Sequence, residues 1–234
     1  MFVTLGNHLR GFAGLFYPTY CAACGNALFR NENTLCLKCY ADIPRTRFHN
    51  DPENEVAQLF WGRVHILNAT SFMYFTKGSR YQHILHELKY KGQKQIGFEM
   101  GKMFGTELLG TAFACADLVH PVPLHFSRQR TRGYNQSELI ARGISRMLKI
   151  PVETGLIIRT ADTGTQTRKS RYERWENVRG IFKVENPSRL YNKHVLLVDD
   201  VITTGSTIEA CANSMLSFSG VSVSIAALAY VKLQ

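Results

Sequence analysis

The sequence predicts an α/β fold in which a parallel sheet is flanked by helices and preceded by a small N-terminal four-cysteine module. Strand-like and helix-like segments alternate from about residue 66 onward, which is the order of parallel βαβ units. In the run VLLVDD at 195–200, four apolar residues typical of a buried strand are followed directly by two aspartates. Two C-x-x-C pairs lie close together ahead of this region.

Composition and charge exclude several classes of protein. The 234 residues are 45% hydrophobic and 20% charged, which are values of a globular chain and not of a disordered one. No apolar stretch reaches the roughly 18 residues of a membrane span, and the N-terminal residues lack the apolar core of a signal peptide. We therefore expect a cytoplasmic protein that is not transmembrane. The formal net charge of +10 favours anionic ligands such as phosphates or nucleic acid.

Four segments are expected along the chain. Residues 1–18 form a short amphipathic helix, with apolar side chains at roughly helical spacing and Pro18 at its end. Residues 19–45 form the cysteine module, and residues 46–65 form a polar linker with little periodicity. Residues 66–234 form the α/β domain.

The first elements of this domain follow in order. NATSFMYF predicts a strand at 68–75, and helices are expected over 79–91 and 94–114. DLVHPVP predicts a buried strand at 117–123, which its prolines end. The arginine-rich residues 124–133 are expected as a loop.

The second half of the domain continues the alternation. Apolar residues at helical spacing predict a helix over 134–149, and a strand is expected within 151–160. Residues 161–179 are expected as a polar, charged loop. The remaining expected elements are a strand at 180–184, the most strongly predicted strand at 193–201, a helix at 206–219 and a last strand at 221–231.

The clustered cysteines indicate a metal site. Two C-x-x-C pairs separated by eleven residues can present four thiolates to one tetrahedral ion. Without a sign of secretion, a structural zinc site is favoured over a disulfide framework. A redox dithiol needs only one pair, whereas an iron–sulfur cluster stays open as an alternative. The expected zinc ligands are Cys21, Cys24, Cys36 and Cys39.

Asp199 and Asp200 end the strongest strand, at the edge where parallel sheets bind ligands. Two adjacent carboxylates repel each other, so hydroxyl donors or a cation must compensate. The turn that follows exposes backbone N–H groups at a helix N-terminus, which suits a phosphate monoester. An acidic pair beside a phosphate cradle indicates a ribose 5-phosphate, while a plain N-capped turn would explain the hydroxyls alone. The expected phosphate contacts are Thr203, Thr204, Gly205, Ser206 and Thr207.

The run HVLLVDDVITTGST (194–207) resembles the 5-phosphoribosyl-1-pyrophosphate (PRPP) motif of type I phosphoribosyltransferases. The cysteine pairs ahead of it, together with HPVPLHFSRQRTRGYNQSELIA (120–141), narrow the resemblance to the ComF family of competence-associated, amidophosphoribosyltransferase-like proteins. This resemblance extends from about residue 12 to the end of the chain. It implies a type I phosphoribosyltransferase-like sheet. It also implies that Asp199 and Asp200 contact the ribose hydroxyls and act in catalysis, and that residues 203–207 bind the 5-phosphate.

The same resemblance implies roles for the charged loops. Arg128, Arg130 and Arg132 lie where such enzymes hold pyrophosphate; they suit a nucleic-acid backbone equally well, and a solvated basic loop is the alternative. Arg168 and Lys169 lie in the place of the flexible catalytic loop, for which an ordinary surface loop is the alternative.

Lys89, Tyr90 and Lys91 form a further basic and aromatic cluster. Such a cluster can face single-stranded nucleic acid through stacking and charge, although a solvated helix end is the commoner explanation.

Two functions from different classes follow from the resemblance. One is an enzyme that transfers phosphoribosyl from PRPP, held with Mg²⁺, to an unknown acceptor. The other is a non-catalytic PRPP-binding accessory that binds single-stranded DNA. Either would act in DNA uptake (natural transformation) or DNA metabolism, with DNA-uptake or helicase machinery as partners. A peripheral position at the inner face of the membrane is a variant of the cytoplasmic location.

Overall fold

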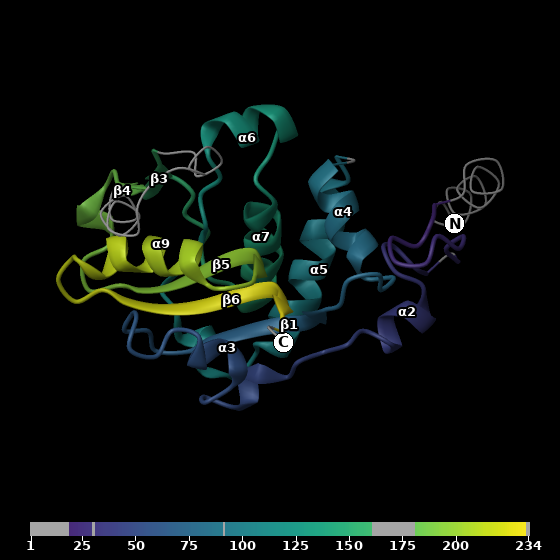
Figure 1. Ribbon diagram of the computed structural model, residues 1–234, viewed down its shortest axis with the longest axis horizontal. Coiled ribbons are helices and arrows are strands. Elements are labelled where there is room, and N and C mark those ends of the chain that lie inside the picture. Colours follow the sequence, from purple (N-terminus) through teal and green to yellow (C-terminus); the bar gives the residue numbers. More distant parts are fainter. Residues whose placement is uncertain (1–18, 30, 91, 161–180, 233–234) are drawn as a thin grey trace, which may run out of the picture.

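A computed structural model describes residues 19–29, 31–90, 92–160 and 181–232. Its centre is a four-stranded sheet in which all neighbouring strands are parallel (Figure 1). The expected parallel sheet is therefore confirmed. The order across the sheet is β1 (Ala69–Phe75), β6 (Ser222–Val231), β5 (His194–Ile202) and β2 (Leu118–Pro121).

The strands are apolar on both faces because both faces are covered. In β5, Leu196 and Val198 belong to one hydrophobic core, whereas Val195 and Leu197 belong to a second. All four side chains are fully buried. A continuous apolar run therefore places β5 inside the sheet, and its first acids come at the carboxyl end.

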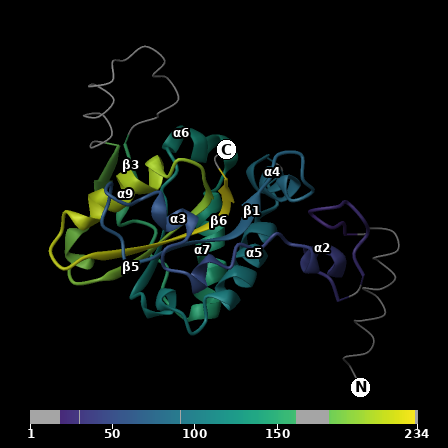
Figure 2. The same cartoon turned by 60° about the horizontal axis from the view of Figure 1, so that its bottom comes forward.

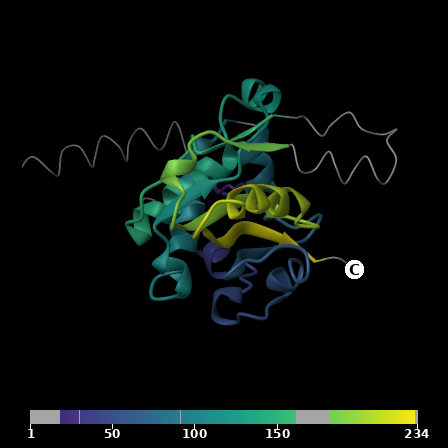
Figure 3. The ribbon, with the colours of Figure 1, turned by 90° about the vertical axis from the view of Figure 1, so that its left-hand side faces the viewer.

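Helices flank the sheet on both sides, as expected (Figures 1 and 3). The first core is closed by α4 (Gln82–Tyr90), α5 (Lys94–Glu107) and α7 (Gln136–Leu148), and the second by α9 (Ser206–Leu216). α5 and α7 touch through their backbones, since a Cβ at Gly143 would lie 2.2 Å from a carbonyl oxygen of α5. Glycine at this position allows the contact that fixes α7, whose first turn carries Ser137 to Asp199 at the end of β5.

Residues 46–65, expected as a polar linker, contain the 3-10 helix η1 (Phe48–Asn50) and the short helix α3 (Glu55–Gln58). Val56 and Phe60 are fully buried in the core on the α9 face. Elements this short give no visible apolar periodicity, which is why the sequence did not predict them. The domain boundaries themselves remain a prediction.

The strands expected at 151–160 and 180–184 are short and do not join the parallel sheet. They are β3 (Ile157–Arg159) and β4 (Phe182–Val184), and they pair with each other in antiparallel fashion. The expectation of parallel units throughout was therefore wrong for this pair. An apolar pattern reports burial, but it does not report which strand lies alongside.

Two expected segments and three short described elements complete the account of the chain. The expected helix at 1–18 and loop at 161–179 lie outside the described residues. Within the described part of the chain, no helix is both long and apolar enough to cross a membrane. The short elements are α2 (Leu37–Ala41), η2 (Ala112–Cys115) and η4 (Pro187–Arg189).

Candidate ligand site and metal centre

The carboxyl end of β5 presents the two predicted acids. Asp199 Oδ1 accepts hydrogen bonds from Ser137 Oγ at 2.8 Å and from the Asp200 backbone N–H at 2.9 Å. Burial, and after it the charge of Asp200, raises the pKa of Asp199 from 3.8 to about 7. The charged form of Asp199 is therefore costly in this environment.

Lys89 provides a cation at this acidic pair. Its Nζ lies 3.0 Å from Asp200 Oδ2, and it comes from α4, far away in the sequence. The sequence had placed Lys89 with Tyr90 and Lys91 in a cluster facing nucleic acid or solvent. The structure instead brings the Lys89 ammonium to the acids, while Lys91 lies outside the described residues.

The turn after β5 leads into the amino end of α9. Gly205 caps the helix with a φ of +75°, and a Cβ there would lie 2.9 Å from the Phe60 ring, so glycine suits both the conformation and the space. The hydroxyl side chains of the turn are exposed, and Thr204 Oγ1 lies 3.0 Å from Ser206 Oγ. Backbone N–H groups at the positive end of α9 and several hydroxyls are thus open to an anion. The predicted phosphate contacts Thr203, Thr204, Gly205, Ser206 and Thr207 all lie in this turn.

Arg63 braces the same turn from the segment expected as a linker. Its Nη1 donates to the carbonyl oxygens of Leu59 at 2.8 Å and Thr204 at 2.9 Å. Its guanidinium also forms an ion pair with Glu209 of α9. Sequence reasoning missed Arg63, because 141 positions separate it from Thr204 and no local motif marks it.

Residues 124–133, expected as a loop, contain the helix α6 (Phe126–Arg132). The His125 side chain caps its first turn by accepting from the Ser127 backbone N–H at 3.3 Å, and Gly133 ends it with a φ of +76°. No residue of α6 is buried, so the sequence carries no apolar stripe that could have predicted this helix.

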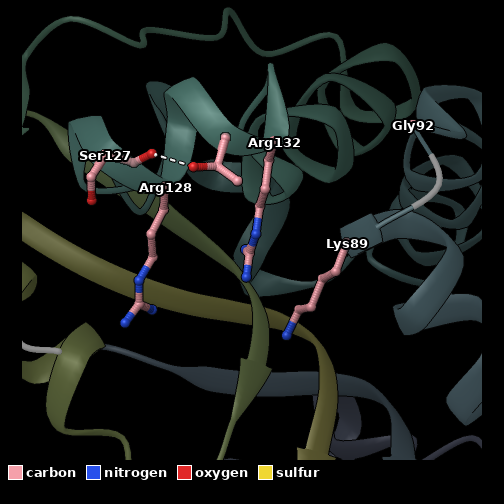
Figure 4. Close-up of a pocket in the computed structure, with 6 residues that line it drawn as sticks. Lys89, Gly92, Ser127, Arg128 and Arg132 are labelled. Carbon is pink, nitrogen blue, oxygen red and sulfur yellow. Dashed lines mark hydrogen bonds between the residues drawn. The ribbon is translucent and has the colours of Figure 1, made fainter.

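A cavity of about 440 Å³ lies between α6 and the end of α4. Arg128 and Arg132, one helical turn apart, line it together with Lys89, and the three cationic side chains extend toward the strands (Figure 4). Arg132 also donates to Gln136 Oε1 at 3.0 Å. Arg130 is not among the lining residues, so two of the three predicted arginines face this space. Three cations around one cavity suit a polyanion such as pyrophosphate.

The other predicted catalytic residues, Arg168 and Lys169, lie outside the described residues. Their place relative to the acidic pair stays a prediction.

The four predicted cysteines converge into one cluster. Their sulfur atoms all lie within 4.8 Å of one another, and Cys24 Sγ is 3.8 Å from Cys36 Sγ. Two thiolates on a tetrahedral zinc ion with Zn–S bonds of about 2.3 Å would be about 3.8 Å apart. The backbone N–H of Cys36 donates to Cys21 Sγ at 3.3 Å, and that of Cys39 to Cys36 Sγ at 3.5 Å. Cys21, Cys24, Cys36 and Cys39 can therefore hold a metal ion, and their thiolates are ligands that zinc prefers.

The cysteine module lies beside the start of α4 (Figure 2), where it contacts Arg80 and Tyr81, the two residues that precede that helix. Tyr81 Oη donates to the Cys39 carbonyl oxygen at 2.9 Å, and Arg80 Nη1 lies 3.8 Å from Cys39 Sγ. Buried Leu35 of the module and Ile84 of α4 share the first hydrophobic core. The start of the helix that carries Lys89 is therefore supported by the cysteine module.

The fold and the site define a phosphoribosyltransferase-type domain joined to a four-cysteine module. The phosphoribosyl transferase domain family matches residues 134–232. The DNA utilization protein YhgH of Escherichia coli (strain K12) is 31% identical over 202 residues, which cover 84% of this chain and 83% of that protein. Competence protein F of Haemophilus influenzae is 40% identical over 93 residues, which cover 39% of this chain and 41% of that protein. The chain belongs to the ComF family of phosphoribosyltransferase-domain proteins.

Among solved structures, the glutamine PRPP amidotransferase from B. subtilis complexed with ADP and GMP is similar to this chain. It aligns with a TM-score of 0.41 and 23% sequence identity, over 56% of this chain and 25% of that one.

Proposed function

We propose that the protein binds PRPP with Mg²⁺ at the carboxyl end of β5 and transfers its phosphoribosyl group to an acceptor nucleophile. One observation carries the proposal: an acidic pair, an anion-binding turn and a cationic cavity meet at one edge of the sheet. These three parts match the ribose hydroxyls, the 5-phosphate and the pyrophosphate of PRPP.

Each part has a distinct role in binding. The ribose hydroxyls donate hydrogen bonds to the carboxylates of Asp199 and Asp200. The 5-phosphate accepts from the backbone N–H groups and hydroxyls of residues 203–207. The pyrophosphate lies in the cavity against Arg128 and Arg132. Carboxylate oxygens suit Mg²⁺, which would offset the charge of the leaving group when it is bound with PRPP.

The proposed reaction is a displacement at C1 of the ribose. The bond between C1 and the pyrophosphate oxygen breaks, and its electron pair leaves with the pyrophosphate. Positive charge develops on the ribose, where the nearby carboxylates of Asp199 and Asp200 stabilise it. A lone pair of the acceptor then forms the new bond to C1. Arg168 and Lys169 are proposed to close over the leaving pyrophosphate.

Calorimetric titration with Mg²⁺ and PRPP tests the site, and a pyrophosphate-release assay on the same sample tests catalysis. Saturable binding that weakens at least about tenfold in Asp200→Asn is expected, since a charge-assisted hydrogen bond contributes about 1.5–3 kcal/mol. Asp117→Asn is the matched control, because Asp117 lies at the opposite, amino end of the sheet. Absence of binding to the unaltered protein would refute the site. Binding without release across amines and nucleobases would favour the non-catalytic accessory.

We also propose a role in DNA uptake or DNA metabolism, supported by the names DNA utilization protein and competence protein F among the relatives. The net charge of +10 and the exposed aromatic side chains Tyr20, Phe29 and Tyr40 of the cysteine module favour single-stranded DNA as a partner. Filter binding at several salt concentrations tests this, because DNA affinity should fall linearly with salt on logarithmic axes. An affinity that does not change with salt would contradict the proposal.

Zinc is the metal proposed for the cysteine module, and the cytoplasm is the proposed location. Elemental analysis of the purified protein should give one zinc ion per chain. Iron with an absorbance band of a cluster would instead support the iron–sulfur alternative.

A further inference from the structure

We propose that Lys89 is a pyrophosphate-binding residue of this site, one that releases Asp200 to the ribose as the ligand enters. The inference rests on the proposed PRPP site and adds a residue from outside its phosphate-binding motif. Lys89 lies on α4, which precedes the matched phosphoribosyl transferase domain.

Lys89 borders both halves of the site. Its ammonium nitrogen is 3.0 Å from Asp200 Oδ2, and its side chain lines the cavity that also holds Arg128 and Arg132. The Lys89 ammonium points toward the strands beside these two guanidinium groups (Figure 4). PRPP joins ribose to pyrophosphate through one oxygen, so a ligand with its ribose at the aspartates and its pyrophosphate in the cavity must pass Lys89.

The position of Lys89 is fixed by contacts on both sides of it. Leu88, immediately before it, is fully buried, and its carbonyl oxygen accepts a hydrogen bond from Tyr134 Oη. Tyr134 directly follows Gly133, which ends α6, and the Lys94 ammonium lies 5.5 Å from the centre of the Tyr134 ring. Tyr134 therefore ties the end of α4 to the end of α6, the two walls of the cavity. The backbone that carries Lys89 is therefore held in place before a ligand arrives.

Charge explains how one lysine can serve both partners. Without ligand, the Lys89 ammonium balances a carboxylate of the acidic pair. When ribose hydroxyls donate to that carboxylate, the ammonium is free to turn its donors to the pyrophosphate oxygens. The ammonium carries three N–H donors on a flexible stem, so it can turn from Asp200 to a phosphate oxygen and keep its hydrogen bonds filled.

Three ligands separate this role from a purely structural one: Mg²⁺–PRPP, Mg²⁺–pyrophosphate and ribose 5-phosphate, each titrated calorimetrically. In Lys89→Met, the affinities for PRPP and pyrophosphate should fall about tenfold or more, as for loss of a charge-assisted hydrogen bond. The affinity for ribose 5-phosphate should stay within about twofold or rise, because Asp200 has lost its competing cation. Lys89→Arg should restore part of the pyrophosphate affinity.

The matched control is Lys193→Met. Lys193 Nζ lies 3.6 Å from Asp117 Oδ1, so this pair is also a lysine–aspartate contact, but it lies at the amino ends of β5 and β2. Binding of all three ligands should be unchanged in this variant.

A second variant keeps the test independent of the folding of Lys89→Met. Tyr134→Phe keeps the buried ring and removes the hydroxyl that holds the Leu88 carbonyl. It should weaken pyrophosphate binding by a smaller factor than Lys89→Met and leave ribose 5-phosphate unaffected.

Equal weakening of all three ligands in Lys89→Met would overturn the inference, since Lys89 would then only position Asp200. Unchanged pyrophosphate affinity would overturn it as well. Failure of the unaltered protein to bind PRPP would refute the proposed function and this inference with it. If the unaltered protein binds PRPP and Lys89→Met binds PRPP and pyrophosphate equally well, this inference is refuted and the proposed function is not.

Discussion

Asp199→Asn should remove PRPP binding and at the same time stabilise the fold at alkaline pH. Both hydrogen bonds to Asp199, from Ser137 Oγ and from the Asp200 N–H, end on Oδ1. Asparagine offers a carbonyl oxygen in the same place, so the variant keeps these bonds and loses only the ionisable group. A change in stability therefore reports the cost of the buried charge.

The raised pKa of Asp199 sets the size and sign of this effect. Its pKa is about 7 in the folded protein and 3.8 without the protein environment. Between these values the native protein binds more protons than the unfolded chain, so stability falls as the pH rises through this window. A shift of about three units corresponds to about 4 kcal/mol lost by pH 8, at 1.36 kcal/mol per unit. Asparagine avoids this loss, so the variant should match the parent near pH 4 and exceed it at pH 8.

Urea unfolding followed by circular dichroism at pH 4 to 8 measures this difference, with PRPP titration on the same samples. The control is Glu185→Gln, because Glu185 is an exposed carboxylate that pairs with Lys183 at 2.9 Å and should show no such gain. A variant no more stable than the parent at pH 8 would refute the buried-charge argument. Undiminished PRPP affinity would refute the assignment of Asp199 to the ribose.

Three further outcomes are expected. Arg63→Ala should weaken ribose 5-phosphate binding several-fold without affecting Mg²⁺–pyrophosphate binding, because Arg63 holds the Thr204 carbonyl of the anion-binding turn. The control Arg189→Ala breaks a surface ion pair and should change the affinity for neither ligand. Metal chelation should lower amide hydrogen-exchange protection in residues 19–45 and in α4, while β5 stays protected. Loss of protection throughout the sheet would contradict a local structural role of the cysteine module. Burial lowers the pKa of His120 from 6.5 to about 4, so the free energy of unfolding should fall by about 3 kcal/mol as the pH falls through that window. His120→Leu should abolish this loss of stability, as measured by urea unfolding at pH 4 to 7.

Asp199 and His120 titrate in opposite senses over nearly the same range. The free energy of unfolding of the parent protein therefore changes less with pH than either group alone would make it change. In each variant, the pH dependence that remains should be that of the other group. For this reason the difference between variant and parent is the informative quantity.

The parts of the site that could be predicted are those whose residues are contiguous. Strand β5, the acids Asp199 and Asp200, and the turn into α9 form one unbroken run, so their juxtaposition follows from chain connectivity. The four cysteines likewise lie within 19 consecutive residues and converge as their spacing predicts. In both cases the ligand chemistry is carried by residue type and local order, which a single sequence contains.

The parts that could not be predicted depend on contacts between distant segments. Arg63 and Thr204 are 141 positions apart, and Lys89 reaches Asp200 from another helix. Neither contact leaves a periodic or local trace. The helix α6 was missed for a different reason: its residues face solvent or the cavity, so the apolar stripe that marks most helices is absent.

Contiguous residues and distant residues are also proposed to contact different parts of the ligand. The contiguous run carries the contacts proposed for the ribose and the 5-phosphate, whereas the cations around the cavity come from α4 and α6. Because Tyr81, the residue before α4, donates to the Cys39 carbonyl oxygen of the cysteine module, a perturbation of that module should affect the proposed pyrophosphate end of the site first. The turn that carries Thr204 is held instead by Arg63, so the proposed 5-phosphate end should keep its geometry. If PRPP binds as proposed, its two chemically distinct halves therefore lie on two separately stabilised parts of the fold.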